Sequence, residues 1–390
     1  AKDDRTFTLD FKKPFGMVLD AFSKPSSIPL FVMPEKVAQT DPFKQITDMT
    51  GSGPYMFAAD RYRPGEKVVY LKNPYYVPRN EPADGTAGGK HVYVDELDWV
   101  ILRDAQTVAN AIEKGEVDVV EMVPNEQYSV LKKNPDIQLL NQTGKQSAML
   151  HLNHAIPPFN NPKIAQAALM AINQAALQRA QIVHKELWNT CTSIYPCGSL
   201  YASDKTDYFT GKPQFKRAQE LLKEAGYDGT PVVLMLPADM PSLNKYPPVM
   251  AELLRRAGFK VDLQSMDWAT LVTRRTKSSP VSEGGWNGFI TFWNQADTFN
   301  PLFFAPLTGS GLKGWFGWTD DPKLEALKDE FVGTSDLAKR KELAEGIQLR
   351  VMDSGVYGML GEAKPIIALR KNISGLVEAP ISVFWGLKKD

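Results

Sequence analysis

The sequence lacks an excess of charge of either sign, and it also lacks a long apolar run. Its 390 residues include 45 Lys and Arg and 45 Asp and Glu, so the formal net charge is zero. Because a basic surface is what attracts nucleic acid or an anionic membrane, this balance predicts neither partner. No apolar run approaches the roughly 18 residues needed to span a bilayer. The composition is that of a globular protein, and the length predicts two or three domains.

The motifs of common catalytic sites are missing as well. The sequence contains no GxSxG, no P-loop, no HExxH and no GxGxxG after a predicted strand. Histidine is scarce, and only His151 and His154 lie near one another. A metal site is one interpretation of this pair, but such a site needs three or four ligands in fixed geometry. We favour a solvated pair at a strand end, and we expect no metal, no cofactor and no catalytic residue.

Cysteine occurs only as Cys191 and Cys197, in a segment that also contains Pro196 and Gly198. The spacing is not the CxxC spacing of a redox or zinc site. Two alternatives remain, a disulfide across this short loop or two free thiols. We favour the disulfide, because the whole cysteine content is confined to one loop of this kind. A disulfide would indicate an oxidising compartment.

The first part of the chain predicts strands and one capped helix. Residues 6–11 alternate between polar and apolar, which is typical of a strand. A strand over residues 92–102 precedes a helix that begins after its N-cap, Asp104, and ends at its C-cap, Gly115. Because another strand is predicted over residues 117–122, we interpret these three elements as a βαβ unit.

The second part of the chain predicts a separate α/β domain that begins near residue 155. Helices are predicted over residues 162–173, 175–184, 215–225, 248–257, 268–276, 322–331 and 337–352. Strands are predicted over residues 137–140, 148–152, 232–236, 260–264, 289–293 and 365–369.

Residues 285–297 are the most informative stretch for function. Residues 289–293 are apolar and β-prone, as in a buried strand, and they lead directly to the amide of Asn294 and the carboxylate of Asp297. In open α/β domains, ligands bind where strands end. The stretch therefore predicts a ligand-binding strand end with Trp293 beside it. An interior strand followed by an ordinary polar loop is the alternative.

Aromatic and basic residues elsewhere fit such a site. Trp315 lies in a glycine-rich segment that predicts a loop, and loop aromatics that face a cleft suit a binding surface. Arg274 and Arg275 follow Trp268, and a guanidinium near a polar and aromatic cleft would bind a carboxylate. Aromatic core packing and solvated surface arginines are the alternatives.

Several segments occur in a characteristic order along the whole chain. They are FTLDFKKPF (7–15), GSGPY (51–55), KNPYY (72–76), AIEKGEVD (111–118), NNPKIAQA (160–167), AQELLKEAG (218–226) and Trp293 with the carboxylate after it. Together they resemble the extracellular solute-binding proteins of family 5, the peptide/nickel/opine class that serves ABC importers.

The resemblance implies an α/β fold of the periplasmic-binding-protein-like II type, with two lobes of mixed sheets and flanking helices. It assigns residues 1–50 to the remnant of an accessory domain, residues 51–152 and 365–390 to a partial first lobe, and residues 153–364 to a second α/β lobe. Relatives have a sizeable portion before the segment that matches Phe7. We therefore expect a C-terminal fragment with an incomplete first lobe, exported to the periplasm, whose signal peptide lies outside the fragment.

The resemblance also implies a function, namely the substrate-binding component of an ABC importer. Such a protein closes two lobes around a peptide-like or other small polar solute, is not an enzyme, and acts as a monomer with the importer permease as partner. Asp297 falls near the family's carboxylate for a ligand amino terminus, and Arg274 falls on the arginine for a ligand carboxylate. The expected ligand-binding residues are Trp268, Arg274, Trp293, Asn294, Asp297 and Trp315.

Two other function classes stay open. A carboxylate-dependent hydrolase would use Asp320 and Asp321, although a helix cap explains this pair better. A chaperone or sensor protein on the same fold would have a partner other than an importer. Product formation that is lost when these carboxylates are substituted would identify the hydrolase.

Overall fold

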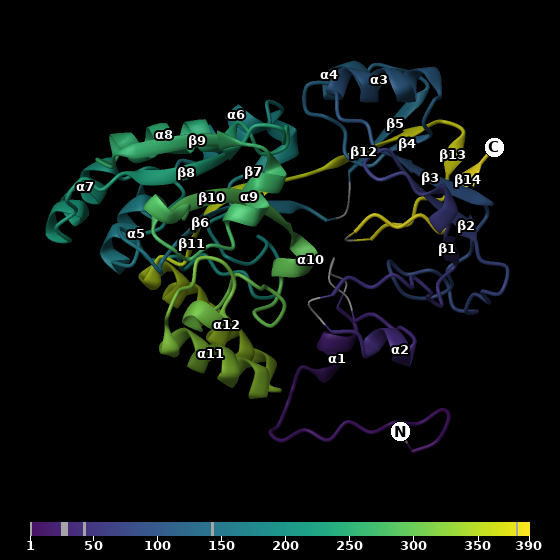
Figure 1. Cartoon of the computed structure of the whole chain (residues 1–390), viewed down its shortest axis with the longest axis horizontal. Coiled ribbons are helices and arrows are strands. Elements are labelled where there is room, and N and C mark those ends of the chain that lie inside the picture. Colours follow the sequence, from purple (N-terminus) through teal and green to yellow (C-terminus); the bar gives the residue numbers. More distant parts are fainter. Residues whose placement is uncertain (1, 25–29, 42–43, 142–143, 380) are drawn as a thin grey trace. The chain divides into compact units, whose positions relative to one another are not determined.

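The computed structural model of the chain describes residues 2–24, 30–41, 44–141, 144–379 and 381–390 (Figure 1). The chain divides into two compact units. The larger unit comprises Ala1–Lys24 and Gln146–Ala363, and the smaller unit comprises Pro25–Lys145 and Lys364–Asp390. Each unit has its own sheets and its own hydrophobic core.

A six-stranded mixed sheet lies at the centre of the larger unit. Its strand order is β7-β11-β6-β10-β8-β9, in which β10-β8 and β8-β9 are parallel and the other pairs are antiparallel. β6 lies between β11 and β10 and is buried along almost its whole length. The strands are β6 (Gln146–Leu152), β7 (Trp188–Asn189), β8 (Val232–Pro237), β9 (Val261–Met266), β10 (Gly288–Asn294) and β11 (Tyr357–Ala363).

Helices complete the core of this unit with their apolar faces. α5 packs against α7, and α11 and α12 lie side by side in Figure 1. Asp267 and Asp321 cap the N-termini of α9 and α11 by accepting hydrogen bonds from backbone N–H groups. Leu177 and Ile347 are fully buried, and burying such a side chain stabilises the fold by about 1.5–3 kcal/mol. The helices are α1 (Val18–Phe22), α5 (Pro162–Met170), α6 (Gln174–Gln181), η2 (Lys185–Leu187), α7 (Phe215–Glu224), α8 (Tyr246–Arg256), α9 (Trp268–Arg274), η3 (Val281–Glu283), α10 (Gln295–Thr298), η4 (Gly311–Lys313), α11 (Pro322–Gly333) and α12 (Leu337–Ser354).

The smaller unit is built on short sheets. One has the order β1-β2-β3, a second has β12 between β4 and β5, and β13 pairs with β14. Asp104 caps α3 by accepting a hydrogen bond from Thr107 N at 2.7 Å, and Gly115 ends the helix with φ +77°. The elements are α2 (Glu35–Ala38), β1 (Tyr55–Phe57), η1 (Ala59–Arg61), β2 (Lys67–Lys72), β3 (Glu96–Val100), α3 (Ala105–Lys114), β4 (Val119–Val120), α4 (Tyr128–Leu131), β5 (Ile137–Asn141), β12 (Ile366–Arg370), β13 (Ile373–Ser374) and β14 (Lys388–Lys389).

The mixed α/β class predicted from the sequence is confirmed, but two local predictions are wrong. The first is the βαβ unit, because β3 and β4 lie in different sheets, where β3 pairs with β2 and β4 pairs with β12. The second is the strand over residues 6–11, since none of the described strands pairs with this segment. Its apolar residues are exposed instead, with Phe7 at 64% and Phe11 at 52%.

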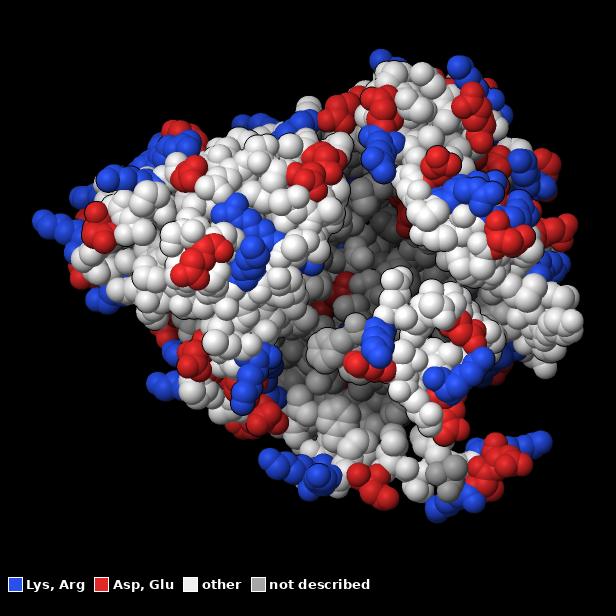
Figure 2. Space-filling view, viewed as in Figure 1, with Lys and Arg blue, Asp and Glu red and all other residues white. Residues whose placement is uncertain are grey.

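The charge balance of the sequence is visible on the surface. On the face shown in Figure 2, basic and acidic side chains are interspersed, with no broad area of one sign. Over the described ranges, no helix combines the length and the apolar character that crossing a bilayer requires.

Candidate functional site

β10 emerges from the core at its C-terminal end. Residues 288–291 are buried, whereas residues 292–294 are half-buried. Asn294 lies opposite Gln146 of β6, and its Oδ1 accepts a hydrogen bond from Gln146 Nε2 at 3.4 Å. α10 follows directly, and its Asp297 is buried. The apolar-to-polar change that the sequence predicted therefore coincides with the end of a strand.

An aromatic cluster lies beside β10. The Trp315 ring centroid is 4.8 Å from that of His151, 4.9 Å from that of Phe316 and 5.6 Å from that of Trp293. His151 is stacked on Phe289 with centroids 4.9 Å apart. Offset and tilted ring pairs of this kind contribute about 0.5–1.5 kcal/mol each beyond their buried area. We define the aromatic cluster as His151, Trp268, Phe289, Trp293, Trp315 and Phe316.

Gly317 allows the loop that carries Trp315 to approach β6. Its φ is +116°, and a Cβ at this position would lie 2.8 Å from Leu152 O. The Gly317 carbonyl also accepts a hydrogen bond from His154 N at 2.7 Å. Because only glycine tolerates this backbone conformation and this approach, residue 317 holds the loop against the end of β6.

His151 is buried, so its interpretation as a solvated residue is wrong. It lies in the central strand β6 and is 2% exposed, with Phe289 and Trp315 against its ring. Burial, together with the smaller effect of the Arg275 charge, lowers the pKa of His151 to about 3. The imidazole is therefore neutral near pH 7, and its Nε2 accepts a hydrogen bond from Trp293 Nε1 at 3.4 Å.

Arg275 extends into the aromatic cluster. Its guanidinium carbon lies 5.1 Å from the ring centroid of Phe316, 5.8 Å from that of Trp268 and 5.9 Å from that of Trp315. These cation–π contacts partly replace the water that the half-buried guanidinium loses. Among the described residues, no carboxylate forms an ion pair with Arg275, and its buried Nε has no hydrogen-bond partner. Burial lowers the pKa of this guanidinium.

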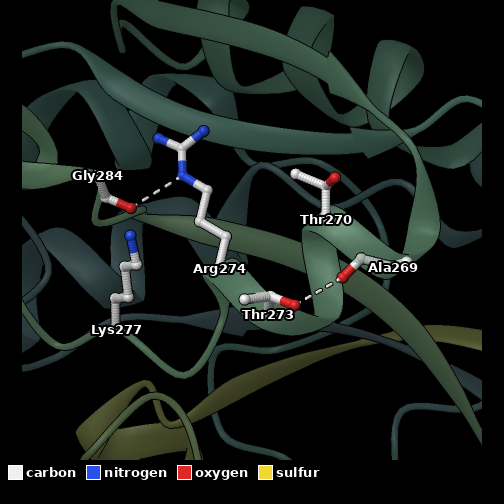
Figure 3. Close-up of a pocket in the computed structure, with 6 residues that line it drawn as sticks. All are labelled: Ala269, Thr270, Thr273, Arg274, Lys277 and Gly284. Carbon is white, nitrogen blue, oxygen red and sulfur yellow. Dashed lines mark hydrogen bonds between the residues drawn. The ribbon is translucent and has the colours of Figure 1, made fainter.

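Arg274 has a different environment, although it precedes Arg275 directly. Its Nη2 donates to Gly285 O at 2.7 Å, and its Nε donates to Gly284 O at 3.1 Å, which is the dashed line between Arg274 and Gly284 in Figure 3. Its Nη1 donates to Gln264 Oε1 at 2.6 Å. Arg274 also lines a surface pocket of about 610 Å³. The other lining residues are Ala269, Thr270, Thr273, Lys277 and Gly284 (Figure 3).

The structure thus separates the predicted binding residues into three groups. Trp268, Trp293 and Trp315 belong to the aromatic cluster, Asn294 and Asp297 lie at the end of β10, and Arg274 supports the loop at residues 284–285. Two members of the site were missing from the predicted binding set, His151 and Arg275. Arg275 follows Trp268 by two turns of helix, which places both on one face of α9, so helical periodicity could have favoured it over Arg274.

The two cysteines form a disulfide, Cys191–Cys197, which confirms the favoured alternative. Cys191 is buried beside Gln174, whose Oε1 accepts a hydrogen bond from Cys191 N at 2.9 Å. The loop between the two cysteines is therefore held both covalently and by hydrogen bonds.

Comparison with known proteins identifies the family of this chain. A sequence model of the bacterial extracellular solute-binding proteins, family 5 Middle, matches residues 1–315. The probable peptide ABC transporter periplasmic-binding protein y4tO of Sinorhizobium fredii is 35% identical over 395 residues, an alignment that covers 100% of this chain and 73% of that protein.

Solved structures share the fold at lower identity. The periplasmic binding protein DppA of Helicobacter pylori, in complex with the peptide STSA, superimposes with a TM-score of 0.70 at 20% identity. That match covers 87% of this chain and 63% of DppA. AgaA of A. tumefaciens R10, in complex with agropinic acid, superimposes with a TM-score of 0.71 at 22% identity and covers 87% of this chain and 67% of AgaA. The chain belongs to the bacterial extracellular solute-binding proteins of family 5.

Proposed function

We propose that this chain binds a peptide-like or other small polar solute that has a carboxylate, and delivers it to the permease of an ABC importer. The observation that carries the proposal is the guanidinium of Arg275. It is half-buried among aromatic rings and, within the described residues, has no carboxylate partner. A ligand carboxylate would pair with this cation in a desolvated setting, where charge-assisted hydrogen bonds are strong. The faces of Trp315 and Phe316 would contact the apolar part of the solute.

The relatives support this class of ligand. The y4tO protein is named as a probable peptide-binding component, DppA is in complex with a peptide, and AgaA is in complex with agropinic acid. A free peptide C-terminus and an organic acid both supply a carboxylate. We expect Asp297 and Asn294, at the end of β10, to contact the opposite, polar end of the solute.

The proposal includes a periplasmic location and a monomer that pairs with the importer permease. The y4tO and DppA proteins are named as periplasmic binding proteins. The disulfide Cys191–Cys197 is compatible with such an oxidising compartment.

Isothermal titration calorimetry with two forms of one peptide tests the proposal. Ser-Thr-Ser-Ala as the free acid should bind about tenfold or more tightly than its C-terminal amide, because one charge-assisted interaction is worth about 1.5–3 kcal/mol. Absence of binding to this peptide, to a panel of dipeptides and tripeptides and to agropinic acid would contradict solute binding. Equal affinity for the acid and the amide would contradict only the role of Arg275.

The hydrolase alternative has no supporting contact at Asp321. Its Oδ1 accepts hydrogen bonds from Lys323 N and Leu324 N, and its Oδ2 accepts from Arg350 Nε at 2.7 Å and from Ser354 Oγ. Burial raises the pKa of this carboxyl, but the hydrogen bonds from Ser354 and Arg350 outweigh that effect and leave the pKa below its ordinary value. Asp321 therefore remains a carboxylate whose oxygens are occupied by structural contacts.

A further inference from the structure

Glu362 is a carboxylate with no exposed surface, in strand β11 of the larger sheet. It belongs to β11, where it lies opposite Ser147 of β6 on one side and opposite Asn189 of β7 on the other. Burying a carboxylate is costly unless hydrogen bonds replace the water it loses. The hydrogen-bond donors of Glu362 therefore show which segments of the chain this residue links.

Within the described part of the chain, Glu362 accepts hydrogen bonds from three separate segments, among others. Glu362 Oε2 accepts a hydrogen bond from Asn189 Nδ2 at 2.7 Å. Its Oε1 accepts from Cys197 N at 2.8 Å and from Gln295 Nε2 at 3.1 Å. Oε1 thus accepts hydrogen bonds both from the disulfide loop and from the first residue of α10.

The two segments that donate to Oε1 are themselves fixed in the larger unit or lead to the predicted binding residues. On one side, the disulfide and the pairing of Gln174 with the backbone of Cys191 fix the loop that presents Cys197 N. On the other side, Gln295 directly follows the last residue of β10 and begins the short helix that contains Asp297. α10 has no side-chain cap of its own, so the Gln295 contact with Glu362 is a tertiary anchor at its start.

We propose that Glu362 is a positioning residue for the solute-binding strand end, and that the Cys191–Cys197 disulfide acts on the binding site through it. The inference rests on the proposed function in that it treats residues 294–297 as part of the binding site. Glu362 contacts no solute in this proposal. It holds Gln295, and with it the backbone that carries Asn294 and Asp297, and the disulfide keeps Cys197 N aimed at the same oxygen.

The test compares Glu362→Gln, Gln295→Ala and the double variant Cys191→Ala/Cys197→Ala with Asn189→Ala as the matched control. Asn189 donates to the other oxygen of the same carboxylate, but it belongs to β7, which pairs with β11 and not with β10. The first readout is hydrogen–deuterium exchange of residues 294–299 in the solute-free protein. The second is the Kd for Ser-Thr-Ser-Ala at a temperature where every variant is folded.

We expect roughly tenfold faster exchange of residues 294–299 and roughly tenfold weaker peptide binding in Glu362→Gln and Gln295→Ala, as loss of one charge-assisted hydrogen bond implies. Combining these two substitutions should add little, because both act on the same contact. The disulfide variant should change both readouts in the same direction. Asn189→Ala should lower Tm without altering either readout.

Unchanged exchange of residues 294–299 in both Glu362→Gln and Gln295→Ala would overturn the inference, as would equal effects of Gln295→Ala and Asn189→Ala. Because exchange is measured without solute, it decides the role of Glu362 even if the wild-type protein fails to bind the peptide. That second failure would count against the proposed function instead.

Discussion

Arg274 and Arg275 are adjacent in the chain, yet their guanidinium groups have different partners. Arg274 donates to the carbonyls of Gly284 and Gly285, whereas Arg275 lies 5.1–6.0 Å from the ring centroids of four aromatic side chains. Successive side chains of a helix point about 100° apart, so neighbouring residues face different surroundings. Arg274 therefore supports a loop, whereas we propose that Arg275 pairs with a ligand carboxylate.

Replacing Arg275 with Gln should weaken binding of the free-acid peptide about tenfold or more and leave the affinity for its amide nearly unchanged. The reason is that only the acid has a carboxylate for the guanidinium to pair with. Calorimetry on both peptides measures the effect. Lys277→Gln, which removes a neighbouring positive charge from the surface pocket, is the matched control and should leave both affinities unchanged. A similar loss in the two variants would mean that general electrostatic attraction dominates.

Replacing Arg274 with Gln should mainly reduce stability. The variant leaves the carbonyls of Gly284 and of the buried Gly285 without these donors, and an unsatisfied buried polar group costs about 1–3 kcal/mol. Urea denaturation should therefore show a decrease of this size in the free energy of unfolding. If the free-acid peptide instead loses more affinity in this variant than in Arg275→Gln, the assignment of the two arginines is reversed.

Replacing Gly317 with Ala should destabilise the loop that carries Trp315. The left-handed φ of +116° and the Cβ contact of 2.8 Å with Leu152 O predict a cost of about 1–3 kcal/mol. Thermal denaturation measures this cost, and the tryptophan fluorescence spectrum should shift as Trp315 moves. Gly346→Ala is the control, since this residue lies in α12 and its Cβ would meet Leu327 at an ordinary 3.8 Å. That variant should be stabilised by roughly 0.5–1 kcal/mol.

His151 predicts a specific dependence of stability on pH. Its pKa is lowered from 6.5 to about 3 in the folded protein, so between these values the unfolded state binds the additional proton. Its contribution to stability is therefore present above pH 6.5 and is lost as pH falls toward 3. Between pH 7 and pH 5 this amounts to about 2 kcal/mol.

Chemical denaturation of the wild type and of His151→Gln at pH 7 and pH 5 isolates the contribution of His151 to the free energy of unfolding. The wild type should lose about 2 kcal/mol more than the variant, whose amide does not titrate. Equal losses in the two proteins would show that His151 is protonated as readily in the folded state as in the unfolded one.

Helices and their ends were predictable because their determinants are close in the sequence. α3 runs between Asp104 and Gly115 as predicted, and the Asp104 cap involves a backbone N–H three residues away. β11 was missed for a physical reason. It is buried on both faces and contains Gly358 and Gly361, so it has neither the alternation nor the β-branched residues that mark a strand.

The sequence by itself determined the family, the capped helices and the apolar-to-polar change at the end of β10, and it favoured the pairing of Cys191 with Cys197. These features depend on local interactions or on motifs that can be read along the chain. Only the tertiary structure decided that Trp315 and Phe316 lie against the guanidinium of Arg275, that His151 is buried and neutral, and that Glu362 joins the disulfide loop to Gln295. Each of these depends on desolvation and on partners far away in the sequence, such as Glu362 and Cys197, which are 165 residues apart. No local pattern encodes which distant side chains will exclude water from a charged or titratable group.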